Sequence, residues 1–597
     1  MARMYFLPVC IFLLISVGCN DHSVSVSVFG TLPSAFNLHS ITFSSQGATF
    51  SWEESQGATS YKLCLKDVSK PDSCDEVTTS EENSCTVSHI STIKFLRSSF
   101  FIIASNEFGE TSSNEKSSIS EELTSLIQYI KSSNTEANDN VGESISFSAD
   151  GYTLAVSASG EDSDADMANG DQSDNSASDS GAVYIFRFNI ISCLWEQIAY
   201  IKASNSGTND AFGTSVSLSA DGNTLAVGAP KEASNSQGIN GSQLNNTAVD
   251  SGAVYVFRDV SGWNQQAYIK ASNSEAGDLF GSSLSLSADG NTLVVGAPGE
   301  ASNAQGVNGS QLDNSAGGSG AVYLFQYSSG WAQHSYIKAS NTEAGDKFGL
   351  KVSLSSDGSI LAVAAENEDS DSTGVNGIES NNSALDSGAV YLFRYGLAWA
   401  QQAYLKASNT DTGDTFGSSI SLSADGTTLA VGAYREDSNS TGVNNEQSDN
   451  SARFCGAVYL FRYESAWIQQ AYIKASNAEA RDRFGYSTSL SFDGNTLAVG
   501  AMSEKSSVSG INGDEVTNGA NQAGAAYLFR YDSEWTQEAY IKAPNTNALD
   551  MYGTSISISA DGEKLAVGAK GEDSYDTGVN GDQSDNSAAS SGAVYIY

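Results

Sequence analysis

The sequence predicts an all-β fold, and three observations lead to that prediction. One block recurs seven times in residues 125–597, with a spacing of 68 residues in all but the first step. Each block reads D-x-F-G-x-S-x-S-L-S-A-D-G-N-T-L-A-V-G-A, a polar stretch, S-G-A-V-Y-x-F-R and W-x-Q-Q-A-Y-I-K-A-S-N, which contains four strand-like runs. Units repeated at a fixed period bury their apolar faces against one another. We therefore predict a seven-bladed β-propeller with four-stranded blades, preceded by a β-sandwich.

The second block shows how the inner strands are predicted. Ser215–Ser219 alternates polar and apolar residues, and Leu225–Ala229 is a run of small apolar residues that suits a crowded centre. Asp221-Gly222 between them is typical of a two-residue type I′ hairpin, in which the glycine takes positive φ.

The outer strand of each block carries a tryptophan and a lysine at fixed positions. We predict that the indoles pack on the neighbouring sheet, and that the lysines are exposed edge residues that block strand-to-strand aggregation. The lysines are Lys202, Lys270, Lys338, Lys406, Lys474 and Lys542.

The two ends of the repeat complement each other. The chain stops at Val594–Tyr597, the third strand of the last block, while the missing fourth strand occurs before the first block as Gln128–Lys131. We therefore predict that this N-terminal strand completes the last blade and closes the ring.

Residues outside the repeat form three further segments. Predicted boundaries are 1–18 for a signal peptide, 31–118 for a β-sandwich, 119–124 for a linker and 125–597 for the propeller. Cys64, Cys74 and Cys85 lie in the sandwich, where an exported protein could form one disulfide among three possible pairs.

The N-terminus is typical of an exported protein. Arg3 is followed by the apolar run Tyr5–Val17, which is too short to span a bilayer as a helix. Gly18-Cys19 resembles a bacterial lipobox, which implies lipidation of Cys19 and an outer-membrane or cell-surface location. Ordinary secretion and a misread start are the alternatives, and membrane contact is expected only through the lipid.

The net charge of −41, from 70 acidic and 29 basic residues, excludes one class of partner. Nucleic-acid binding requires clustered Lys and Arg to neutralise phosphates, so we expect no nucleic-acid partner. A solvated acidic coat and divalent-cation binding by loop carboxylates both remain open.

Two families resemble parts of the chain. Thr49–Trp52, Gly57–Leu63 and Phe101–Ser112 resemble strands of a fibronectin type III module, which implies a spacer or a binding platform. Phe212-Gly213 and Gly228-Ala229-Pro230, with their counterparts in other blocks, resemble the FG-GAP repeats of integrin α-chain propellers and bacterial relatives. That resemblance implies an adhesion-type propeller that uses one face for its partners.

The calcium loop of that family is absent from the expected place. Calcium-binding integrin blades carry D-x-D-x-D-G between their first two strands, whereas this chain has only Ala-Asp-Gly there, too short to surround calcium.

Acidic residues gather instead between the second and third strands of several blocks. Alternating acids along an extended loop could supply oxygen ligands to calcium, and a disordered hydrated loop is the alternative. The candidate ligands are Asp162, Asp164, Asp166, Asp369, Asp371, Asp437, Asn439, Asp573 and Asp576.

These loops and the blade-to-blade connections are expected at the same end of the blades. Loops on a rigid scaffold are where function usually concentrates, so we predict a ligand-binding face there. It would include the aspartate that precedes each Phe-Gly pair or its counterpart: Asp139, Asp210, Asp278, Asp346, Asp414, Asp482 and Asp550.

The predicted function is an exported cell-surface binding or adhesion protein whose acidic propeller face binds an extracellular protein or glycan, with calcium as a possible aid. The alternatives are a self-associating surface or matrix protein, and a propeller-based polysaccharide lyase or hydrolase. We expect no enzyme, because His334 is the only histidine of the repeat and is predicted to be an exposed substitution.

Overall fold

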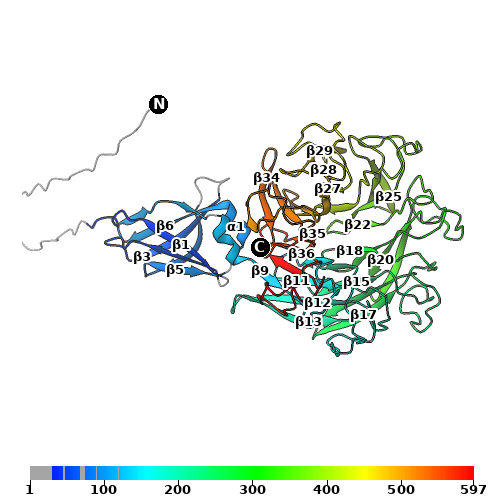
Figure 1. The fold of residues 1–597 in the computed structure, drawn as a ribbon, viewed down its shortest axis with the longest axis horizontal. Coiled ribbons are helices and arrows are strands. Elements are labelled where there is room, and N and C mark those ends of the chain that lie inside the picture. Colours follow the sequence, from blue (N-terminus) through cyan, green and yellow to red (C-terminus); the bar gives the residue numbers. More distant parts are fainter. Residues whose placement is uncertain (1–29, 45–46, 68–73, 89, 119) are drawn as a thin grey trace, which may run out of the picture.

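The computed structural model describes residues 30–44, 47–67, 74–88, 90–118 and 120–597. The predicted signal peptide and the lipidation site Cys19 lie outside the described residues. The regular secondary structure of the described chain is almost entirely β, and its strands form separate sheets (Figure 1). None of the described helices combines the length and the apolar character needed to cross a membrane.

The N-terminal part consists of two sheets that share one core. Phe50, Trp52, Leu63, Phe100 and Ile102 lie in this core and are almost completely buried. One sheet has the order β1 (Leu38–Ser44), β2 (Gly47–Trp52) and β5 (Ser84–Val87). The other contains β4 (Asp75–Ser80), β3 (Ser60–Asp67), β6 (Ser98–Asn106), β7 (Gly109–Ser112) and β8 (Lys116–Ser117).

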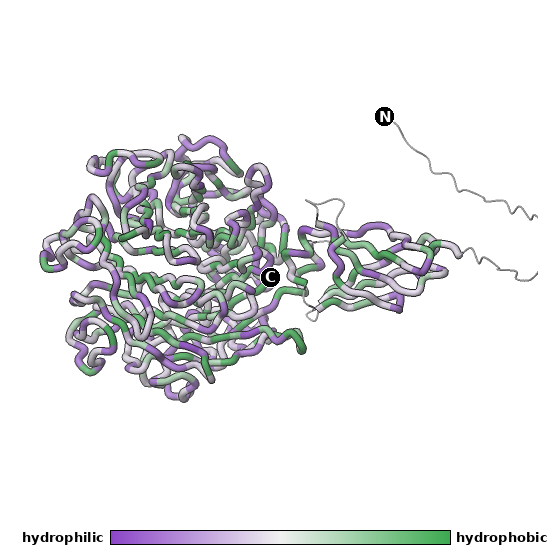
Figure 2. Tube along the Cα trace, turned by 180° about the vertical axis from the view of Figure 1, so that it is seen from behind, coloured by the Kyte–Doolittle hydropathy of each residue, from purple (hydrophilic) through white to green (hydrophobic). Residues whose placement is uncertain are grey.

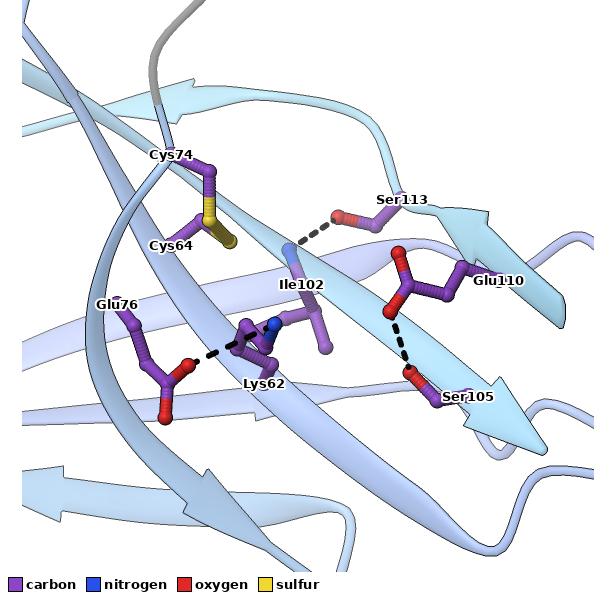
Figure 3. Close-up of a disulfide and its surroundings, with 8 residues drawn as sticks. All are labelled: Lys62, Cys64, Cys74, Glu76, Ile102, Ser105, Glu110 and Ser113. Carbon is purple, nitrogen blue, oxygen red and sulfur yellow. Dashed lines mark hydrogen bonds and ion pairs between the residues drawn. A yellow bond between two sulfur atoms is a disulfide. The ribbon is translucent and has the colours of Figure 1, made fainter. Parts of the chain in front are cut away.

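A disulfide fastens the edge of the second sheet. Cys64 on β3 is bonded to Cys74, which directly precedes β4 (Figure 3). Cys85 on β5 is a free thiol, and burial raises its pKa to about 11. The pairing that the sequence left open is therefore Cys64–Cys74.

The repeat contains seven sheets, each with four main antiparallel strands. The first three consist of β10 (Ile145–Phe147), β11 (Thr153–Ala158), β12 (Ala182–Asn189) and β13 (Leu194–Ile201); β14 (Ser215–Leu218), β15 (Thr224–Ala229), β16 (Ala253–Asp259) and β17 (Trp263–Ile269); and β18 (Ser283–Leu286), β19 (Thr292–Ala297), β20 (Ala321–Tyr327) and β21 (Trp331–Ile337). The next two consist of β22 (Lys351–Leu354), β23 (Ile360–Ala365), β24 (Ala389–Tyr395) and β25 (Trp399–Leu405); and β26 (Ser419–Leu422), β27 (Thr428–Ala433), β28 (Ala457–Tyr463) and β29 (Trp467–Ile473).

The last two sheets differ slightly from the others. The sixth contains β30 (Phe484–Leu490), β31 (Thr496–Ala501), β33 (Ala525–Tyr531) and β34 (Trp535–Lys542), and the short β32 (Gly510–Ile511) adds to its outer edge. The seventh has the order β35 (Tyr552–Ile558), β36 (Leu565–Ala569), β37 (Ala593–Ile596) and β9 (Gln128–Ile130). The fourth strand of the last sheet thus comes from the start of the repeat.

The sheets pack through apolar strands whose side chains are almost fully buried. The second strand of the second sheet, β15, is buried at all six positions. The outer-strand tryptophans are buried as well, and Trp331 Nε1 donates to Gln266 Oε1 of the preceding sheet at 3.0 Å, which confirms the packing predicted for these indoles. Figure 2 shows the resulting distribution, in which hydrophobic segments run along the strands and hydrophilic segments along the outer loops.

The turn between the first two strands differs from the predicted type I′ hairpin. Gly222 has a φ of 68° and donates its N–H to Ser219 O at 2.9 Å, but Asp221 is not among the residues with positive φ. A type I′ turn requires positive φ at both central residues, so that prediction is wrong. Asp221 Oδ1 instead accepts from the Ser219 hydroxyl at 2.5 Å and from Asn223 N at 3.0 Å. These hydrogen bonds of the Asp221 side chain fix the conformation of the turn.

Backbone hydrogen bonds join the seven turns in sequence. Each donates one N–H to a carbonyl of the turn that follows, and the last, Ala560, donates to Ala149 of the first at 2.9 Å. The donors are Ala149, Ala220, Ala288, Ser356, Ala424, Phe492 and Ala560. The first and seventh sheets are therefore neighbours in the same way as every other consecutive pair.

The N-terminal sheets contact the sixth and seventh sheets of the repeat. Helix α1 (Thr92–Arg97) is the part nearest to the repeat in Figure 1, and the 3-10 helix η1 (Ser120–Leu126) directly precedes β9. The Arg97 guanidinium makes two hydrogen bonds to the Glu538 carboxylate, at 2.6 and 2.7 Å. Leu123 of η1 is fully buried in a core shared by both parts, so the two are packed together.

Candidate functional site

A buried ion pair recurs in all seven sheets. The lysine at or just after the end of the outer strand pairs with the glutamate that opens the loop between the second and third strands, and both side chains are at most 1% exposed. The pairs are Lys131–Glu572 (3.0 Å), Lys202–Glu161 (2.9 Å), Lys270–Glu232 (2.8 Å), Lys338–Glu300 (2.9 Å), Lys406–Glu368 (2.8 Å), Lys474–Glu436 (2.7 Å) and Lys542–Glu504 (2.8 Å). The prediction that six of these lysines, all except Lys131, are exposed edge residues is wrong.

Further hydrogen bonds satisfy both charges. In the second sheet Glu232 accepts from Tyr268 Oη at 3.1 Å and from Asn205 Nδ2 at 3.0 Å, and Lys270 donates to Ser251 Oγ at 2.7 Å. Burial lowers the pKa of Lys270, and the Glu232 charge partly offsets this. The network joins one loop, one outer strand and one sheet-to-sheet connection, so we assign it a structural role.

The end of the sheets from which these loops emerge is called the loop face below. It carries the loops 159–181, 230–252, 298–320, 366–388, 434–456, 502–524 and 570–592 between second and third strands, and the connections that lead from each sheet to the next. The turns at Asp-Gly and the hairpins between third and fourth strands lie at the opposite end of the same strands.

The seven aspartates predicted for the ligand-binding face lie below this surface. Their residues are between 1% and 7% exposed. Asp278 Oδ2 accepts the backbone N–H of Glu275 at 2.7 Å, and equivalent bonds occur at Asp139, Asp346, Asp414, Asp482 and Asp550. Burial is the main cause that raises the pKa of these carboxyls, to about 7 at Asp278 and about 8 at Asp139.

These raised pKa values give the fold a defined pH dependence. Each carboxyl binds a proton more tightly in the folded chain than in the unfolded chain, where its pKa is about 4. The stabilisation is complete below about pH 4 and is lost as the pH rises through 7 to 8. We expect the melting temperature to fall between pH 5 and pH 8, measured by calorimetry at constant ionic strength.

A variant tests the source of this dependence. Asp278→Asn cannot ionise and keeps an oxygen that accepts from Glu275 N, so its melting temperature should depend less steeply on pH. Each carboxyl protonated only in the folded state changes the unfolding free energy by about 1.4 kcal/mol per pH unit. A melting temperature that stays level or rises over this range would contradict the assignment.

The acidic loops have a defined, repeated conformation. Asp162 Oδ1 accepts the backbone N–H of Asp179 at 2.8 Å, and the equivalent carboxylates of Asp369, Asp437 and Asp573 accept from Asp386, Phe454 and Ser590. Each of these donors has positive φ. In each of these loops a carboxylate near the start therefore binds the backbone near the end, which fixes the conformation of the loop. The alternative prediction of a disordered loop is wrong for them.

The candidate calcium ligands do not converge in the described structure. The carboxylates of Asp164, Asp166 and Asp371 project from exposed loop residues of two different sheets, the first and the fourth. Asn439, Asp573 and Asp576 belong to the fifth and seventh sheets. Among residues 30–597, apart from the few undescribed positions, no group of three or more His, Cys, Asp or Glu side chains could hold a metal ion.

His334 is exposed on β21, and its Nδ1 lies 2.9 Å from the neighbouring Ser335 Oγ. Its ring lies edge-on to Tyr395 of the next sheet, with 5.5 Å between the ring centroids. The prediction of an exposed substitution is confirmed.

A cavity of about 480 Å³ lies where the first strands of all seven sheets meet. We call it the axial cavity. Its wall is mostly Ser, Thr and apolar residues, and its charged residues are Glu143, Lys351, Glu366 and Lys570. Glu143 precedes β10 while Glu366 and Lys570 follow β23 and β36, so the cavity opens toward the loop face.

Sequence reasoning missed both the buried ion pairs and the axial cavity. A signal for the pairs was present, because Glu232, Glu300 and Glu504 keep the opening glutamate in the three loops that lack the acidic pattern. A signal for the cavity was the departure of Lys351 from the serine at that position in the six other blocks.

Comparisons with known proteins agree with the repeated pattern. A family model described as the FG-GAP repeat matches residues 195–257, 263–325, 331–393, 399–461, 467–529 and 535–597. Each matched segment starts at an outer-strand tryptophan and extends through the third strand of the next sheet. Together these segments cover more than half of the chain.

Two solved structures are similar to the chain. One is described as the structure of U3-55K, which is 9% identical with a TM-score of 0.42; the match covers 79% of this chain and 98% of that one. The other is described as the crystal structure of RRP9 WD40 repeats, also 9% identical, with a TM-score of 0.41 and coverage of 79% and 96%. A comparison with curated proteins found no match.

Proposed function

The chain belongs to the FG-GAP repeat family, and on that premise we propose that it is an exported surface protein that binds a protein or glycan through the loop face. The observation that carries the proposal is the position of seven loops of about 20 residues on one end of a rigid stack of sheets. Loops held by a rigid scaffold are the usual place for binding residues. The role is binding rather than catalysis.

The proposed architecture is a closed seven-bladed β-propeller preceded by a fibronectin type III-like sandwich. The backbone hydrogen bonds that join the seven turns support closure, and so does the pairing of β9 with β37, in which Tyr129 lies opposite Tyr595. The two N-terminal sheets around Trp52 and Phe100 support the sandwich. In this arrangement the sandwich acts as a spacer between the membrane and the propeller.

Export is proposed from the N-terminal sequence. The short apolar run before Cys19 is typical of a cleaved leader, and a lipid on Cys19 would hold the protein at the outer membrane or cell surface. The Cys64–Cys74 disulfide agrees with this proposal, because disulfides persist mainly in oxidising compartments.

A paired set of variants tests the binding face. The protein is applied to an immobilised panel of glycans and extracellular proteins, and each hit is titrated. The double variant Asp164→Asn/Asp371→Asn, which neutralises exposed loop-face carboxylates, is expected to change affinity at least tenfold. Glu464→Gln/Asp532→Asn, at exposed hairpins of the opposite end, is the matched control and should bind as the unchanged protein does.

Equal effects of the two double variants, or no hit on the panel, would contradict the proposal. A calorimetric calcium titration forms a further arm of the same experiment. If the unchanged protein binds calcium saturably and the loop-face variant does not, calcium is assigned to the acidic loops. The dissociation constant is expected in the roughly 10⁻⁴–10⁻³ M range of extracellular modules. Absence of heat makes binding on this face independent of calcium.

A further inference from the structure

The axial cavity departs from the seven-fold pattern at one ring of residues. Six sheets place a serine at the same register position in the wall: Ser144, Ser215, Ser283, Ser419, Ser487 and Ser555. The fourth sheet places Lys351 there. A repeated position that changes in only one unit is where a specific ligand contact could be added to a symmetric scaffold.

The serines have a structural task that Lys351 does not perform. The hydroxyl of Ser215 donates to Gly281 O of the next sheet at 2.8 Å, and the same bond is made by Ser283, Ser419, Ser487 and Ser555. Within the described residues, Lys351 makes no such bond, so the fourth sheet lacks this hydrogen bond to the fifth sheet. The lysine side chain is instead exposed to the interior of the cavity.

The other charges around the cavity are already paired. Lys570 lies 3.3 Å from Glu143, and Lys347 just outside the wall lies 3.6 Å from Glu366. No ion pair or hydrogen bond of the Lys351 ammonium occurs in the described part of the chain. Desolvation of the ammonium inside the cavity lowers the pKa of Lys351, and the negative charges of Glu366 and Glu143 partly offset this effect. A bound anion would supply the partner that this ammonium lacks.

Aromatic residues also break the pattern, and they lie in the two sheets that follow. Tyr434 and Tyr486 line the cavity with their rings edge to face, 5.5 Å apart. No other sheet has an aromatic residue at either position. The residues equivalent to Tyr434 are Ser159, Pro230, Pro298, Glu366, Met502 and Lys570, and those equivalent to Tyr486 are Glu143, Thr214, Ser282, Leu350, Ser418 and Thr554. Tyrosine offers an apolar ring face together with a hydroxyl, a combination suited to a ligand that is itself apolar on one side and polar on the other.

We propose that the axial cavity binds a single sugar acid, with its carboxylate on Lys351, its ring against Tyr434 and Tyr486, and its hydroxyls toward the serine-rich wall. A charge-assisted hydrogen bond to an ammonium is the strong polar contact expected of a carboxylate. The cavity volume of about 480 Å³ admits one sugar residue with water rather than a long chain.

The net charge of −41 also favours a small ligand, because the field of the whole protein opposes the approach of a long polyanion. This site is separate from the acidic loops, so the proposed function and this inference can fail independently.

The test is a calorimetric titration of the full protein with glucuronate, glucose and acetate at constant ionic strength. We expect saturable binding of glucuronate, with glucose and acetate each at least tenfold weaker. Lys351→Ser, which installs the residue found in the other six sheets, should weaken glucuronate binding at least tenfold. Its melting temperature should be unchanged or higher, because serine can restore the bond to the next sheet.

Two further variants make the result specific. Lys351→Met keeps a long side chain without charge and should lose glucuronate in the same way. Lys231→Ser removes one exposed positive charge from the loop face outside the cavity, and should bind glucuronate as the unchanged protein does. The proposal is overturned by the absence of glucuronate binding, by equal binding of glucose or of acetate, or by full binding in both Lys351 variants.

Discussion

Replacing residues 125–131 by seven glycine and serine residues is expected to lower the melting temperature by more than any other change of similar size. Tyr129, Ile130 and Lys131 are fully buried, and β9 forms the outer strand of the last sheet. Ile127 is buried as well. Losing the three large apolar side chains of Ile127, Tyr129 and Ile130 costs about 1.5–3 kcal/mol each. Removing Lys131 also leaves Glu572 as an unpaired buried charge, which adds about 3–5 kcal/mol.

The loss also has a topological part. Without β9, the strand β37 becomes an open edge at the junction between the last and first sheets. A control replaces the exposed hairpin residues 464–466 and 532–534, which read Glu-Ser-Ala and Asp-Ser-Glu, by glycine and serine, and should leave the melt nearly unchanged. Calorimetry compares the two proteins. If both melt like the unchanged chain, β9 does not stabilise the last sheet, and the proposed closure of the propeller loses its support.

The arrangement of strands could be predicted because each step depended on local pattern. Alternation in Ser215–Ser219 and the apolar run Leu225–Ala229 correspond to β14 and β15. The pairing of β9 with β37 followed from a strand missing at one end and present at the other. Only the turn type failed, since the Asp221 side chain determines that turn together with the φ of Gly222.

The burial of charged residues could not be predicted in the same way. A lysine on an outer strand is usually exposed, and the pattern of Lys270 alone does not show that the loop of the same sheet folds back over it. The backbone pairing between Ile239 and Ile269 brings the loop to that strand, and Glu232 reaches the ammonium from there. The burial of the seven aspartates was missed for the same reason, because the connections between sheets fold over their carboxylates.

The axial cavity depends on contacts that no single block contains. Lys351, Tyr434 and Tyr486 lie in three different sheets and meet only because the sheets surround one axis. The sequence shows each of them as a departure from the repeated text, but their proximity depends on the register between sheets. Asymmetry within a repeat is therefore the pattern that most usefully indicates a site in such a protein.

The second large effect is expected from breaking one buried ion pair. Lys270→Met leaves the Glu232 carboxylate buried without its cation, which should lower the unfolding free energy by about 3–5 kcal/mol. Lys270→Met/Glu232→Gln removes both charges and keeps an oxygen that can accept from Tyr268, so its cost should be clearly smaller. Lys231→Met, at an exposed position on the same loop face, is the control and should change stability by less than about 0.5 kcal/mol.

Urea unfolding of the four proteins measures these differences, and equal stability of the single and double variants would show that the charge of Glu232 is not the cause.

A comparison of the seven sheets indicates which residues of the ion-pair network are essential. The fifth has Cys455 and the sixth has Ala523 where the second has Ser251, yet both keep the lysine and the glutamate. Ser251→Ala should therefore cost only about 0.5–1.5 kcal/mol, as the loss of one hydrogen bond does, whereas Lys270 and Glu232 must be retained or removed together.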